Sequence, residues 1–162
     1  MHKRLSLEIK MQNKFQQSVV SGIVATIVMT LIMILGGLIG MPKMSPPEMM
    51  SAMMEVPVAM GWVMHFIIGI IFAAGYVFIF SNLLKKISSK YLRGAIYGII
   101  AFILAQIGFP LMEGIFGAGN MPAPEGSMAL MMIGGIMGHV IFGIVIALMV
   151  KTKTSFTKQI IK

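Results

Sequence analysis

Apolar residues are concentrated in four long runs that contain no charged side chain. The runs cover residues 19–40, 57–80, 94–112 and 128–150. Each has about the 20 residues that an α-helix needs to cross the hydrocarbon core of a bilayer. The runs do not alternate apolar with polar residues, as the strands of a transmembrane barrel do. The pattern therefore predicts an all-α membrane protein with four transmembrane helices, built as a single membrane domain over residues 1–162.

Charge predicts the orientation of these helices. The segments before the first run, between the second and third, and after the fourth hold 12 of the 13 basic residues. In a chain with four spans these three segments lie on one side of the membrane. Because basic loops stay on the cytoplasmic side, we expect both termini in the cytoplasm and the protein in a bacterial inner membrane. The basic residues lie close to the helix ends, which favours contact with anionic lipid headgroups over nucleic acid.

The four predicted helices read as two tandem hairpins, roughly residues 18–80 and 92–150. Apolar glycine–histidine motifs in the second helix of each half lie 74 residues apart, and glycines of the first helix lie 72 apart: Gly22 with Gly94, and Gly36 with Gly108. Each half has an even number of spans, so the two repeats share one orientation. A pseudo-twofold axis along the membrane normal is expected to relate them.

The repeated motif carries the candidate site. Each copy places a histidine four residues from a glycine on either side, and residues four apart share a helical face. The two copies are Gly61, His65 and Gly69, and Gly135, His139 and Gly143. Ionisable side chains are costly in hydrocarbon, so each of these histidines is a candidate functional residue. At 1.5 Å per residue they lie at similar depth, about 12 and 16 Å below the outer helix ends.

Helix packing is one interpretation of these histidines. Small residues four apart let transmembrane helices approach closely, and a buried imidazole forms hydrogen bonds across such a contact. Gln106 in the third run and Thr26 and Thr30 in the first are the expected partners. In this interpretation the His65–His139 pair organises the core and binds no cofactor.

A second interpretation is a cofactor held between the second and fourth helices. Two histidines on facing helices bind haem b in some helix bundles, and flanking glycines would leave room for the macrocycle. Copper is a third interpretation, because the chain has 19 methionines and thioether sulfur suits Cu(I). Met54 and Met128 each stand eleven residues before a motif histidine, so they would form a copper site with His65 and His139.

The segments between the runs predict further features. In residues 41–56, Pro46 and Pro47 suit a helix start, and methionines at helical spacing between Glu48 and Glu55 predict a short interfacial helix. The tail before Ser18 is expected to form a basic amphipathic helix on the inner leaflet. The tyrosines are expected at the membrane interfaces: Tyr76, Tyr91 and Tyr97.

The sequence contains none of the catalytic motifs considered below. There is no cysteine, no HExxH zinc motif, no Gly-x-Ser-x-Gly elbow and no nucleotide-binding glycine loop. No pair of carboxylates lies inside the four runs. We therefore expect no catalytic residues.

The segment from Gly61-Trp62 to His65, followed by Gly69 and Tyr76, resembles a known family of membrane proteins. So do Gly22 to Thr26, Gly40 to Met44 and Gly138 to Gly143. The family consists of small bacterial four-helix membrane proteins known only as a domain of unknown function. The resemblance covers nearly the whole chain and implies the fold, but it transfers no mechanism. The expected function is thus a structural or interaction subunit, either a homo-oligomer or part of a larger membrane complex.

Overall fold

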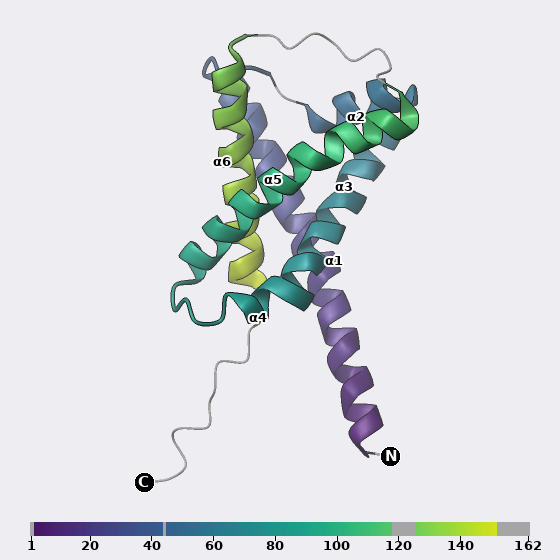
Figure 1. Ribbon diagram of the computed structural model, residues 1–162, viewed down its shortest axis with the longest axis vertical. Helices are drawn as coiled ribbons and strands as arrows, with labels where there is room; N and C mark the ends of the chain where they lie inside the picture. Colours follow the sequence, from purple (N-terminus) through teal and green to yellow (C-terminus); the bar gives the residue numbers. More distant parts are fainter. Residues whose placement is uncertain (1, 44, 118–125, 152–162) are drawn as a thin grey trace.

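The computed structural model describes residues 2–43, 45–117 and 126–151, with side chains from Asn13 onward (Figure 1). No β-strand occurs in these ranges. The elements are α1 (His2–Leu38), α2 (Pro46–Met54), α3 (Val58–Gly75), the π-helical turn η1 (Tyr76–Phe80), α4 (Ser81–Leu83), α5 (Lys90–Phe116) and α6 (Met128–Met149). The predicted all-α class is confirmed.

Four helical segments are long and apolar enough to cross a membrane. They are Asn13–Leu38, Val58–Leu83, Lys90–Phe116 and Met128–Met149. They coincide with the four predicted runs, and three of them extend several residues further at one or both ends. The second segment continues from α3 through η1 and α4 without leaving the helical path.

The N-terminal tail does not form a separate helix. It is helical as expected, but α1 runs without a break from His2 to Leu38. No glycine or proline stands between His2 and Ser21, so nothing in the sequence interrupts the helix there. The expected helix is therefore confirmed and is continuous with the first span, whereas its position on the inner leaflet stays a prediction.

Glycines set the distances between the long helices. Where α1 meets α3, a Cβ added to Gly22 would lie 2.7 Å from Ile70 Cα; where α5 meets α6, a Cβ on Gly94 would overlap Ile144 Cα. The contact of α1 with α6 joins the two hairpins, and there Gly138 faces the side chains of Met29 and Met33. Such residues allow backbones to touch, which is how helices gain packing contacts in lipid.

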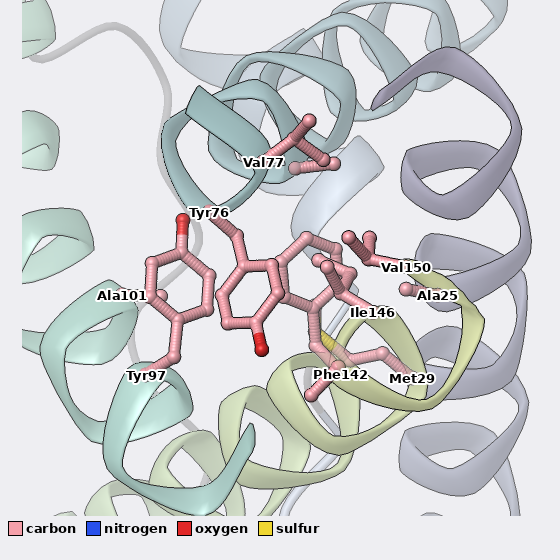
Figure 2. Close-up of a cluster of buried hydrophobic side chains, with 11 residues drawn as sticks. Ala25, Met29, Tyr76, Val77, Tyr97, Ala101, Phe142, Ile146 and Val150 are labelled. Carbon is pink, nitrogen blue, oxygen red and sulfur yellow. The ribbon is translucent and has the colours of Figure 1, made fainter. Parts of the chain in front are cut away.

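The hydrophobic core lies where η1 and the first half of α5 meet α1 and α6 (Figure 2). Tyr76 and Tyr97 are both 1% exposed, with ring centroids 5.0 Å apart. The Tyr97 hydroxyl donates to the Phe72 carbonyl, which satisfies its polar group inside the core. The expected interface position is therefore wrong for these two tyrosines, whereas Tyr91 is 64% exposed.

The predicted short helix between the first two spans is confirmed as α2. Pro46 and Pro47 occupy its first turn, where their missing N–H groups would have no helical partner. Glu55 ends the helix in the left-handed conformation, with φ of 53°. Met50 and Met53 are buried, so α2 packs onto the protein. Its main contact is with α3.

Basic side chains gather at one end of the bundle, which we call the basic end: Lys14, Lys85, Lys86, Lys90 and Lys151. The spanning part of α1 begins there, and α4 and α6 end there (Figure 1). Lys90 Nζ donates to the Leu148 carbonyl at 3.5 Å, and the Lys151 backbone N–H donates to the Gln17 side chain at 3.0 Å. The first bond lies within the second hairpin, and the second joins the two hairpins at this end. The opposite end, which carries α2 and the start of α6, is called the outer end.

Candidate functional site

His65 forms a buried hydrogen bond between α3 and α1. Its Nε2 lies 3.0 Å from the Thr30 hydroxyl oxygen, and the side chains are 5% and 7% exposed. The Thr30 hydroxyl also donates to the Thr26 carbonyl at 2.8 Å. Because that hydroxyl has one proton, it accepts from His65, which places the imidazole proton on Nε2. Thr30 was among the expected partners.

Neighbouring elements fill the space that the two glycines on either side of His65 leave open. A Cβ on Gly61 would overlap the Pro47 carbonyl at the start of α2. A Cβ on Gly69 would overlap the Thr26 hydroxyl of α1, which is buried and has no hydrogen-bond partner among the described residues. The motif glycines of this half therefore admit backbone and side chains of α2 and α1.

His139 lies half-buried on α6 and is held differently. Its Nδ1 lies 2.8 Å from the Gly135 carbonyl one turn earlier. A carbonyl only accepts, so the proton is on Nδ1, and Nε2 carries the lone pair. The ring meets Phe102 of α5 edge to face, with centroids 5.6 Å apart. A Cβ on Gly143 would overlap the carbonyl oxygen of Gly94.

The two histidines thus face residues of different chemical type at equivalent positions of the two halves. Thr30 and Phe102 lie 72 residues apart, the same spacing as Gly22 and Gly94. Thr30 bonds His65, whereas Phe102 offers His139 only an aromatic ring. The first histidine is committed to a contact between helices, and the second bonds its own helix and keeps one nitrogen available.

Other side chains proposed from the sequence are not brought to these rings by any hydrogen bond in the described part of the chain. Gln106 lies on an exposed face of α5, so the expectation that it bonds a motif histidine is wrong. Met54 is the last residue of α2, and Met128, 67% exposed, is the first of α6. No group of three or more His, Asp or Glu residues that could hold a metal occurs in the residues described.

Two features of the site region have little signal in the sequence. The Tyr76–Tyr97 pair joins η1 to α5, and its only hint is that both tyrosines stand inside apolar segments. Arg93 resembles the other basic residues in sequence, yet it is 8% exposed and its Nε has no partner among the described residues. Burial of both depends on how α5 crosses the other helices.

Comparison with known proteins gives one match. The model of a family of unknown function, DUF6789, matches residues 12–160. Neither the curated proteins nor the solved structures contain a match to the chain.

Proposed function

The chain belongs to this family of unknown function, and we propose that it is a non-enzymatic structural subunit located in a membrane. In this proposal the chain associates with a second copy of itself. The observation that carries this proposal is the outer half of α5. This half of the helix has few neighbours in the fold, and it presents a polar side chain, Gln106, on an exposed face within an apolar span.

The exposed face of α5 is mixed in character. Positions four, seven and eight residues after Gln106 lie on the same helical face. The residues of this face are all exposed: Gln106, Pro110, Glu113 and Gly114. Gln106 stands ten residues before the end of α5, which is about 15 Å along the axis and thus inside the hydrocarbon. An amide facing lipid has no partner there, and burying it unpaired is costly.

A second copy of the chain fits this face. A primary amide contains both donors and an acceptor, so two Gln106 side chains related by a twofold axis can pair with each other. Gly114 leaves space on the same face about two turns further along α5, since nothing lies within 4 Å of a Cβ added there. Polar side chains and small residues are the groups that join helices in membranes.

Replacing Gln106 with leucine tests this association. We expect dimer dissociation in bilayers or mild detergent to become roughly 3- to 30-fold easier, the range of one polar contact between helices. Self-association of labelled protein across a concentration series measures this, with helix content checked by circular dichroism. Leu104→Ala, on another face of α5, is the control and should change nothing. A wild-type protein that stays monomeric at all concentrations would contradict the proposal.

The two hairpins are proposed to be tandem repeats in parallel orientation. Matched contacts support this. Gly69 packs on Thr26 and the Gly22 carbonyl, and Gly143 packs on Gly98 and the Gly94 carbonyl, at positions shifted by 74 and 72 residues. His65 and His139 also face equivalent positions of the neighbouring helix, Thr30 and Phe102.

The basic end is proposed to face the cytoplasm of a bacterial cell, in contact with anionic headgroups of the inner membrane. Its lysines lie on the segments that join or end the spans, and Lys85 and Lys86 are exposed. Basic residues near helix ends favour the cytoplasmic side and attract anionic lipid at about 1 kcal/mol each.

Haem b binding by both histidines is the second candidate. His139 favours it, because an Nδ1–H bound to a backbone carbonyl is the usual arrangement of an imidazole that ligates metal through Nε2. His65 does not fit, since its Nε2 is bonded to Thr30 and the space at Gly61 and Gly69 is filled. The pair therefore fits a packing role better than axial ligation.

Spectra of the purified protein separate these functions. We expect a colourless protein without a Soret band and with iron well below one atom per chain. A Soret band that disappears in both His65→Gln and His139→Gln would instead establish haem binding and contradict the packing role of the pair. Reconstitution with added haem during expression is the control for cofactor loss.

A further inference from the structure

A small hollow lies between α1 and α6 near the outer end. Three methionines line it, one from each of three segments: Met33 in α1, Met41 in the loop after α1, and Met137 in α6. Gly36, Gly134 and Gly138 also line it and leave it open. Its free volume is about 20 Å³, which is the space of one water-sized body.

The methionine side chains stand at the edges of this space. A Cβ on Gly138 would lie 3.4 Å from Met33 Sδ, and one on Gly36 would lie 3.7 Å from Met41 Cβ and Cγ. Met33 and Met41 are half-buried, and Met137 is 42% exposed. Methionine often serves as an adaptable filler of gaps in cores. Here three of them line the same gap.

The chemistry of the lining selects a narrow class of ligand. No charged side chain lines the hollow, and the Gly36 carbonyl already accepts bonds from the N–H groups of Ile39 and Met41. Hard cations need oxygen ligands, and zinc prefers thiolate, imidazole or carboxylate. Thioether sulfur is soft and neutral, which suits Cu(I) and its analogue Ag(I).

We propose that Met33, Met41 and Met137 form a thioether site for a single Cu(I) ion. The site uses neither motif histidine, and it differs from the set of Met54, Met128 and the histidines considered from sequence. It lies toward the outer end, away from the lysines of the basic end. Lys43 is at the outer end, where it is exposed and its side chain lies against Gly37. The ion binds without a change of oxidation state. The site is independent of self-association through α5.

Metal titration of the purified chain tests this site. Cu(I) is added under anaerobic conditions in competition with a chromophoric chelator, and Ag(I) binding is measured by equilibrium dialysis. We expect one ion per chain and a sulfur-only ligand shell by X-ray absorption. Changing all three residues together, Met33→Leu, Met41→Leu and Met137→Leu, should weaken binding by at least about tenfold, since leucine nearly keeps the volume but removes the sulfur.

Matched controls separate this site from general methionine binding. The variant Met60→Leu, Met128→Leu and Met132→Leu removes three exposed methionines elsewhere and should bind Cu(I) like the wild type. His65→Gln with His139→Gln should also leave binding unchanged. No binding by the wild type, retention by the first triple variant, or equal loss in the control triple variant would each overturn the site. Dimerisation measured on the same samples reports separately on the α5 face.

Discussion

Gly94→Val is expected to separate α5 from α6 and to destabilise the fold by about 3 kcal/mol or more. A Cβ on Gly94 would overlap Ile144 Cα and come within 2.7 Å of the Gly143 carbonyl oxygen. Both are backbone atoms of a helix, so they cannot rotate away as the end of a flexible side chain can. The second hairpin would have to open along its whole contact. Reversible unfolding in mixed micelles, followed by circular dichroism, measures the loss.

Gly108→Val is the matched control on the same helix. Nothing lies within 4 Å of a Cβ added to Gly108, and both glycines stand inside α5. The two substitutions therefore change helix propensity alike, and their difference isolates the contact with α6. Equal stability of the two variants would show that α5 and α6 do not meet at Gly94.

His65→Ala is the second large change, with an expected loss of about 3 kcal/mol from the cavity and the missing bond. The imidazole is buried between α3 and α1 and bonded to Thr30. Thr30→Val keeps the shape of its side chain and removes only the hydroxyl, so it should cost about 1 kcal/mol. In the double variant the two losses should not add, because both remove the same bond. Unfolding in mixed micelles measures all three.

His139→Ala is the internal comparison for this prediction. His139 is half-buried and bonds a carbonyl of its own helix, so its loss should weaken the contacts between helices less than the loss of His65. A larger cost at His139 than at His65, or additive losses for His65 and Thr30, would contradict the packing role of His65.

The four spans and α2 could be predicted because length, charge and turn residues mark them directly. The side of each span that faces the inside of the bundle could not be predicted. In lipid the outside of a helix is as apolar as its inside, so an apolar run contains no amphipathic pattern. This is why Gln106 was expected at a histidine and lies instead on an exposed face. It is also why Tyr76 and Tyr97 were expected at an interface and lie in the core.

The candidate site was predictable only in part for the same reason. The spacing of glycine and histidine predicts one shared face, and Gly61, His65 and Gly69 are buried together. The role of each imidazole depends on the residue that faces it across the contact. Thr30 and Phe102 occupy equivalent positions, and one is polar while the other is aromatic. That difference appears only when both helices are placed.

The contact between α1 and α6 joins the first and last spans of the chain, and it bears on the order in which the protein assembles during synthesis. Contacts of α1 with α3 form between neighbours in sequence, and they become available once the first hairpin leaves the ribosome. Met29 and Met33 of α1 meet α6 only after the final span has been inserted. Until then, this face of α1 is not covered by α6 and remains exposed to lipid in the bilayer. A chain stopped before α6 would keep that surface uncovered, so a quality-control protease could distinguish an unfinished copy from a complete one.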